Sequence, residues 1–265
     1  GAQEAARKLG YILLTVNTGN DPELEAQEIK ALRRYRVDGF LYAMMYHRVV
    51  DIPAELEGSP MVVVDSEDAQ GRIPSVYPDD ELAGYDATNR LIQAGCRRIV
   101  YYGSDTTIIA QGERFAGYQR ALAQAGIPFD ERLVVNVIED VNAAQEAARV
   151  FDEIRPDGIF CFNDVRATFI YEAARERSII IGKDVSVISI DNQPFITDVL
   201  KPSLTTLQLP HYEMGFDAVR QLVGKLDGER AVESLDYDES IVKRSGDGLQ
   251  TSLRCSVIER DSIVR

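Results

Sequence analysis

Polar side chains stand directly after several buried apolar runs of this chain. The β-branched run 185–190 stops at Asp191, and the run 158–162 stops at Asn163. Such runs are typical of strands that are buried on both faces. In open parallel sheets, ligands bind beyond the carboxyl ends of the strands. The carboxylate and the amide therefore predict a site for a polar small molecule.

An arginine on the apolar side of a predicted helix is the second candidate. Phe115, Tyr118 and Leu122 recur at helical spacing, and Arg114 projects onto nearly the same side. A buried guanidinium needs an acceptor, and its planar fork suits hydroxyl or carboxylate partners. The alternative is an internal salt bridge or a surface arginine whose stem lies on apolar surface. Together with Asp191, which could instead cap a turn, Arg114 would offer the donor and acceptor that a polyhydroxylated ligand requires.

Catalytic and metal-binding motifs are weak in this sequence. The two histidines, His47 and His211, are predicted to lie at the surface or at a hinge, and no G-x-S-x-G, P-loop or G-x-G-x-x-G pattern is present. The acidic run 79–81 stands at a predicted helix start, where carboxylates usually complement the helix dipole rather than bind a metal. The sequence predicts a binding protein without cofactor or metal, and an α/β enzyme stays open as an alternative.

Helices and strands alternate along the chain. Strands separated by helices of this length build right-handed βαβ units around parallel sheets, which predicts an α/β fold. The predicted strands are 11–16, 40–43, 61–64, 99–102, 158–162 and 185–191, and the predicted helices are 2–9, 21–35, 80–93, 112–125, 142–153 and 167–177.

The composition of the chain limits its possible binding partners and its cellular compartment. A net charge of −14 over 265 residues opposes contact with DNA phosphates and with anionic lipid. No apolar run approaches the roughly 20 residues that cross a bilayer, and no signal peptide is recognisable. Cys96, Cys161 and Cys255 are odd in number and widely spaced, which favours buried thiols in a reducing compartment. We therefore expect a cytoplasmic protein that binds no membrane.

Several segments resemble one known family. Arg114–Tyr118 is similar to the R-x-x-G-[FYW] segment of the lactose/galactose-repressor (LacI/GalR) family of bacterial transcriptional regulators. Asp184–Asn192 and Pro202–Thr206 also match family segments. Further matches, all in family order from about residue 10 to the end, are Arg36–Gly39, Ile159–Asp164, Glu213–Gly215 and Cys255–Arg260.

The resemblance implies a periplasmic-binding-protein-like type I fold. In it, two doubly wound parallel-sheet subdomains are joined by three crossing strands, with an effector between them. The N-terminal subdomain would comprise residues 1–95 and about 210–253, and the C-terminal one about 96–209 and 254–265. The crossings would fall near 94–97, 209–211 and 253–256. The family's first strand would precede Gly1, since this sequence starts in what resembles the first helix.

The resemblance also implies effector contacts. Arg114 and Asp191 would grip effector hydroxyls, and Asn163 would add a hydrogen bond. Asp79 would face them from the N-terminal subdomain, in a segment similar to the family's D-N-x-x-x-G; its alternative role is a helix cap.

Two phenylalanines adjoin Asn163, and the pocket edges depart from the family pattern. Phe160 and Phe162 are effector-contact candidates, and core packing is the stronger interpretation for at least one of them. Ile108, Ala110 and Leu209 stand where members often carry polar or aromatic contacts, so the pocket edges are less polar.

The implied partners follow from the same family. They are a small-molecule effector, which is a sugar or related polyol, a second copy of the chain in a homodimer, and operator DNA. DNA would be bound only through an N-terminal helix-turn-helix that these residues do not include. The alternative is a periplasmic sugar-binding protein of a transporter; the odd cysteine count and the absence of a signal peptide weigh against it.

Overall fold

The computed structural model describes residues 1–105, 107–138, 142–233, 235 and 237–264. It divides into two compact units. Unit 1 comprises Gly1–Pro78 and Pro210–Leu253, and unit 2 comprises Asp79–Leu209 and Arg254–Arg265, so the chain passes three times from one unit to the other. Each unit has its own sheet and is described by itself.

The first boundary differs from the expected one. It falls at Pro78/Asp79 rather than at 95/96 because helix α3 (Asp80–Gln93) packs along helix α4 (Ile109–Gln124), and both belong to unit 2. The other two passages are at 209/210 and 253/254.

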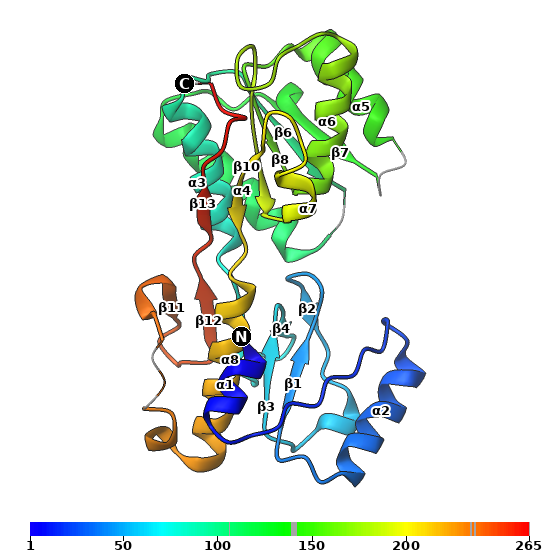
Figure 1. The fold of residues 1–265 in the computed structure, drawn as a ribbon, viewed down its shortest axis with the longest axis vertical. Helices are drawn as coiled ribbons and strands as arrows, with labels where there is room; N and C mark the ends of the chain where they lie inside the picture. Colours follow the sequence, from blue (N-terminus) through cyan, green and yellow to red (C-terminus); the bar gives the residue numbers. More distant parts are fainter. Residues whose placement is uncertain (106, 139–141, 234, 236, 265) are drawn as a thin grey trace. The chain divides into compact units, whose positions relative to one another are not determined.

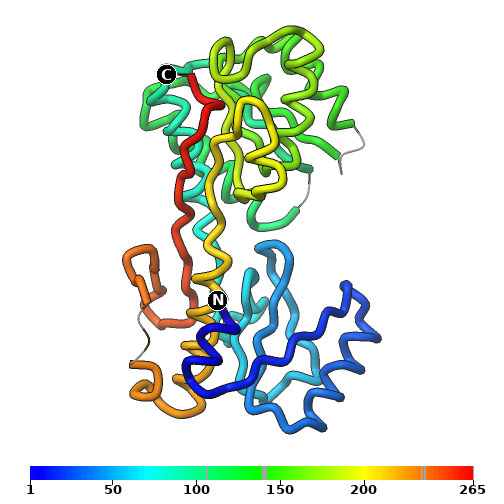
Figure 2. Tube along the Cα trace, viewed as in Figure 1, coloured from blue at the N-terminus to red at the C-terminus, as the bar shows by residue number. Residues whose placement is uncertain are grey.

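Unit 2 contains a six-stranded sheet in the order β13-β10-β9-β8-β6-β7 (Figure 1). All neighbours are parallel except β13, which runs antiparallel beside β10; the two lie side by side in yellow and red in Figure 2. After β6 the chain adds β7 on one side and then β8, β9 and β10 on the other, so the strand order reverses at β6 and β8. The strands are β6 (Ile99–Ser104), β7 (Val134–Val137), β8 (Gly158–Cys161), β9 (Ser186–Asp191), β10 (Thr205–Gln208) and β13 (Ser256–Ile258).

Both faces of this sheet are buried, as the apolar runs predicted. Side chains alternate along a strand, so Tyr102 and Ile159 pack under α5 (Ala143–Arg149) and α6 (Asp164–Glu176), whereas Tyr101 and Phe160 pack under α3 and α4. The sheet is therefore doubly wound. The remaining helical segments of unit 2 are η2 (Glu131–Leu133), α5 (Ala143–Arg149) with a wider turn (Val150–Ile154), α6 (Asp164–Glu176) and α7 (Pro194–Thr197).

Two glycines allow α3 and α4 to pack backbone against backbone. A Cβ on Gly84 would lie 2.1 Å from the carbonyl oxygen of Arg114, and a Cβ on Gly117 would lie 2.1 Å from that of Glu81. No larger residue fits at either position without separating the helices. The glycine of the R-x-x-G segment thus fixes the distance between the helix that carries Arg114 and the start of α3.

Unit 1 is a smaller α/β layer structure. Its sheet has the order β1-β3-β5-β12-β11, with β11 antiparallel to β12 and the other neighbours parallel. Val62 faces α8 and Met61 faces α2, so helices cover both faces. The strands of this sheet are β1 (Phe40–Ala43), β3 (Met61–Val64), β5 (Ser75–Pro78), β11 (Val242–Arg244) and β12 (Gln250–Leu253), and β2 (Val49–Val50) and β4 (Glu67–Asp68) form a separate small pair. The helices of unit 1 are α1 (Ala2–Lys8), α2 (Pro22–Arg34) and α8 (His211–Asp227). Short 3-10 turns lie at Ala54–Leu56, Glu229–Ala231 and Glu239–Ile241.

The strand predicted at 11–16 is wrong. Among the described residues this segment joins no sheet, and Ile12, Leu14 and Val16 are exposed. An apolar run becomes a strand only when a neighbouring strand accepts and donates its backbone hydrogen bonds. In the described part of unit 1 the sheet ends at β1, which pairs with β3.

His47 was predicted to lie at the surface or at a hinge, and of these two positions the surface is wrong. His47 is buried, its ring stacks on Tyr77 with centroids 4.4 Å apart, and a ring nitrogen lies 3.1 Å from Glu67 Oε1. The burial predicted for Cys96, Cys161 and Cys255 is confirmed, and all three are free thiols. Within the described ranges, no helix combines the length and apolar character that a membrane span requires.

Candidate functional site

The predicted polar groups gather in unit 2, at the carboxyl ends of β8 and β9 and along α4. Arg114 is buried on α4, where Nε donates to Asp80 Oδ1 at 2.7 Å and Nη1 donates to the carbonyl oxygen of Phe162 at 2.8 Å. Its guanidinium also lies over the Phe162 ring, 4.6 Å from the ring centre. Helix α3 and the end of β8 thus fix the guanidinium plane, and Nη2 has no partner among the described residues.

The Arg114 guanidinium remains charged despite its burial. Burial by itself lowers the pKa of Arg114, but the negative charges of Asp80 and Asp191 and the hydrogen bond to Asp80 outweigh it, so the pKa lies above its ordinary value. The internal salt bridge that the sequence left open is present. This salt bridge uses the Nε edge of the Arg114 guanidinium, and Nη2 of the same charged group remains available as a donor.

Asp191 is the last residue of β9 and supplies an acceptor. Its Oδ2 accepts a hydrogen bond from Gln193 Nε2 at 3.0 Å. Burial raises the pKa of Asp191 to about 7; Arg114 opposes the rise, and the nearby Asp164 carboxylate adds to it. The carboxylate therefore changes charge near neutral pH.

The backbone at Asp191 is strained. Asp191 has a φ of 127° and Asn192 has a φ of 58°, both in the region that favours glycine. Non-glycine residues hold such conformations where surrounding structure enforces them, and these places are often functional sites. The strain turns the chain sharply at the strand end and presents the Asp191 carboxylate there.

Asp164 holds the ends of β9 and β10 together beneath this turn. Its buried carboxylate accepts hydrogen bonds from the hydroxyl of Ser189, from Thr206 Oγ1 at 2.8 Å and from the backbone N–H of Gln193 at 2.7 Å. Burial raises the pKa of Asp164, and these hydrogen bonds oppose the rise. Asp164 is a positioning residue for the loop that carries Asp191 and Gln193.

Asn163 and Asp79 both cap helices. Asn163 Oδ1 accepts from the backbone N–H of Arg166 at 2.9 Å at the start of α6, and Asp79 Oδ1 accepts from that of Leu82 at 3.0 Å at the start of α3. The Asn163 amide nitrogen has no partner in the described part of the chain, so it can still donate to a ligand. Asp79 lies in unit 2 and acts as the helix cap that the sequence left as its alternative.

The two phenylalanines have different surroundings. Phe160 is fully buried, and its ring meets Tyr101 edge-on with centroids 5.3 Å apart, so it belongs to the core. Phe162 is 6% exposed and supports the Arg114 guanidinium. Of this pair, only Phe162 stands beside the polar groups.

Sequence reasoning missed Asp80 and Gln193. Asp80 recurs at helical spacing with the buried residues Ala83, Ala87 and Leu91, and this pattern marks it as the inward-facing acid of α3. Gln193 carried no pattern in the sequence. Its role depends on the strained turn after β9.

The arrangement is suited to binding. It offers a charged donor in Arg114, an acceptor in Asp191 and a neutral amide donor in Asn163. All three lie near the carboxyl ends of β8 and β9, next to the point where the strand order reverses. Both histidines of the chain lie in unit 1, so unit 2 holds no histidine base.

Comparisons with known proteins agree on one relationship. A model of the periplasmic binding protein-like domain matches residues 88–245. The HTH-type transcriptional regulator RegA of Clostridium saccharobutylicum is 30% identical over 242 residues, which cover 89% of this chain and 72% of RegA. The crystal structure of a LacI-family regulator from Rhizobium etli superposes with a TM-score of 0.82 at 27% identity, covering 100% of this chain and 92% of that one. A complex of the regulator CelR with cellobiose has the same fold, with a TM-score of 0.76 at 22% identity over 98% of this chain and 76% of that one.

Proposed function

The chain belongs to the lactose/galactose-repressor (LacI/GalR) family of transcriptional regulators as its effector-binding part, and we propose that unit 2 binds a neutral sugar or related polyol as the effector. Arg114, Asp191 and Asn163 are the proposed hydrogen-bonding contacts, and Phe162 supports them. The protein binds this molecule without transforming it.

The observation that carries the proposal is the pairing of a buried guanidinium with a half-buried carboxylate whose pKa is about 7. A hydroxyl group can accept from Arg114 Nη2 and donate to Asp191 at the same time. An anionic ligand would face the carboxylates of Asp80, Asp164 and Asp191, so a neutral ligand is favoured. The cellobiose complex of a structural relative supports the choice of a sugar.

We propose a homodimer as the functional assembly, in the cytoplasm. Phe195 and Val199 lie four residues apart in and after α7, and they are 73% and 68% exposed. Exposed apolar side chains one helical turn apart would leave water if a second copy of the chain packed against them. Operator DNA would be bound by a helix-turn-helix outside these residues, because the net charge of −14 opposes phosphate contact.

Calorimetry with a panel of neutral mono- and disaccharides, each matched by its phosphate ester, tests the effector class. We expect a neutral member to bind, and Arg114→Gln to weaken it about tenfold to a hundredfold, because hydrogen bonds to charged groups contribute about 1.5–3 kcal/mol. Arg175→Gln, which removes an exposed arginine on α6 of the same unit, is the matched control. A folded Arg114→Gln variant with unchanged affinity would remove Arg114 from the site.

A further inference from the structure

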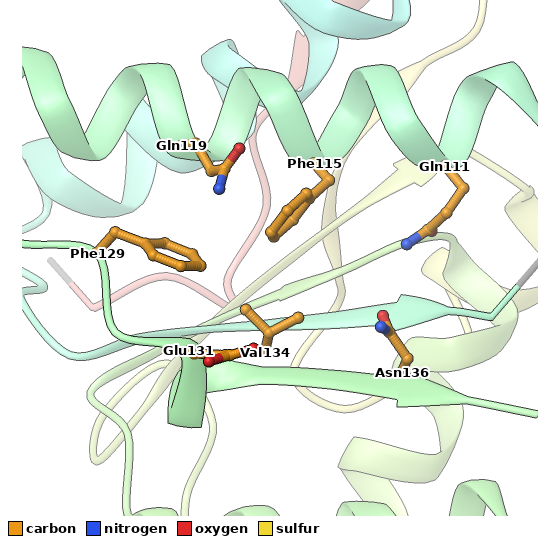
Figure 3. A pocket seen from close by; sticks show the side chains of 7 residues that line it. All are labelled: Gln111, Phe115, Gln119, Phe129, Glu131, Val134 and Asn136. Carbon is orange, nitrogen blue, oxygen red and sulfur yellow. The ribbon is translucent and has the colours of Figure 1, made fainter.

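A cavity of unit 2 lies on α4 between that helix and the edge strand β7 (Figure 3). Its volume is about 380 Å³, within the range of small-molecule sites. None of the proposed effector contacts lines it. The lining residues are Gln111, Phe115, Gln119, Phe129, Glu131, Val134 and Asn136.

Two aromatic rings form one corner of this cavity. Phe115 and Phe129 meet at 72° with centroids 6.1 Å apart, and Figure 3 shows both rings turned toward the space above Val134. Phe129 is 46% exposed although it is a large apolar side chain. Rings at this angle cannot sandwich a flat base, but they offer an apolar wall to the C–H face of a puckered ring.

Amide groups line the other end. Gln111 Oε1 accepts from the hydroxyl of Tyr101 at 3.2 Å and from the backbone N–H of Ser104 at 3.1 Å. These two hydrogen bonds fix the orientation of the amide group, and its Nε2 is the donor that faces the cavity. A Cβ on Gly103 would lie 2.9 Å from both Gln111 Nε2 and Asn136 Oδ1. The absence of a side chain at Gly103 therefore lets a donor and an acceptor converge over the same point.

The charge of the lining residues restricts the class of ligand further. Glu131 is the single charged residue among those that line the cavity, and it is an acid in a chain of net charge −14. Anions are disfavoured. Amides and a carboxylate beside an apolar wall match the hydroxyl edge and the C–H face of a neutral sugar ring.

We propose that this cavity is a second binding site, distinct from the effector site, for a neutral hydroxylated ring of monosaccharide size. Phe115 and Phe129 contact the apolar face of the ring, and Gln111, Gln119 and Asn136 bind its hydroxyl groups. The occupant lies on α4, the helix that also carries Arg114.

Methyl-detected NMR of the whole chain, with valine methyl groups labelled, tests the proposal, and Val134 serves as the reporter. Titration with methyl β-D-glucopyranoside should shift the Val134 signals with a millimolar dissociation constant, and glucose 6-phosphate should bind at least several-fold more weakly. Phe129→Ala and Gln119→Ala should each weaken the glycoside about tenfold. Ile180→Ala, which removes an exposed apolar side chain elsewhere in unit 2, and Asp191→Asn, in the effector site, should leave the Val134 response unchanged.

Three outcomes would overturn the proposal. The first is no shift at Val134 with the glycoside at tens of millimolar. The second is an equal shift in the Phe129→Ala variant. The third is a Val134 response to adenosine but not to the glycoside, which would mean that the cavity takes a planar base.

Discussion

Asp191→Asn should stabilise the fold and weaken effector binding at pH 8 tenfold or more. The native carboxyl has a pKa of about 7, against an ordinary value of 3.8, because folding buries it. A carboxyl whose pKa is raised by folding destabilises the native state above its ordinary pKa, since the unfolded chain ionises more easily. The neutral asparagine amide removes this penalty and keeps an oxygen for the hydrogen bond from Gln193.

The gain in the free energy of unfolding follows from the rise in the pKa of Asp191 from 3.8 to about 7. At 1.36 kcal/mol per unit of pKa, this rise corresponds to about 4 kcal/mol as an upper value. Partial exposure of Asp191 lowers the expected gain to about 2–4 kcal/mol at pH 8. At pH 5 the native carboxyl is already protonated, so only the ionisation of the unfolded chain counts. The gain there should be about 1–2 kcal/mol.

Urea denaturation at pH 5 and pH 8, without ligand, measures both gains. Asp105→Asn, an exposed carboxylate in the same unit, should leave the free energy of unfolding unchanged within about 0.5 kcal/mol. Effector affinity of Asp191→Asn at pH 8 should fall tenfold or more, because an amide accepts a weaker hydrogen bond than a carboxylate. Two results would contradict this reasoning: a variant that is less stable than the parent at pH 8, or a gain in stability that does not depend on pH. Either would mean that burial of the charged Asp191 carboxylate does not lower the free energy of unfolding.

Further predictions concern the same site. Effector affinity of the parent should fall about tenfold between pH 8 and pH 6, as Asp191 protonates; calorimetry showing no change would mean that the neutral carboxyl binds equally well. Arg114→Leu should lower the free energy of unfolding by about 3–5 kcal/mol, because it breaks the buried ion pair with Asp80, and chemical denaturation would contradict this with a loss below about 1 kcal/mol. Gly84→Ala should destabilise the protein, although alanine favours helices by about 1 kcal/mol, because its Cβ would meet the Arg114 carbonyl oxygen at 2.1 Å; a raised melting temperature would show that α3 and α4 can separate without cost. Asp79→Ser should keep the α3 cap and leave effector affinity unchanged, and calorimetry that shows a tenfold loss would make Asp79 a contact residue.

The fold was predictable where burial determines the pattern. The run that ends at Asp191 shows its two-sided burial in its composition, and β9 occupies that position. The segment 11–16 has similar composition, yet it forms no strand in the described structure. Composition reports how well a segment fits a sheet, whereas strand formation also needs a backbone partner that the local sequence does not reveal.

The cluster of polar side chains around Arg114 was predictable in its residue types and less so in its contacts. Arg114 was recognisable because a charge stood on an apolar helix face. That Asp80 is the partner of Arg114 depended on the close packing of α3 against α4 at Gly84 and Gly117, although the helical spacing of Asp80 marks it as facing inward. Burial raises the pKa of Asp191, and Arg114, Asp164 and Asp80, which are far apart in the sequence, modify the rise.

The most direct test of the central claim is a crystal structure of this chain with the neutral sugar that calorimetry identifies. We predict one ligand hydroxyl oxygen within hydrogen-bond distance of both Arg114 Nη2 and the Asp191 carboxylate, with Asn163 Nδ2 donating to a second hydroxyl. A ligand that binds tightly in solution but contacts neither Arg114 nor Asp191 in the crystal would contradict the assignment of the effector site.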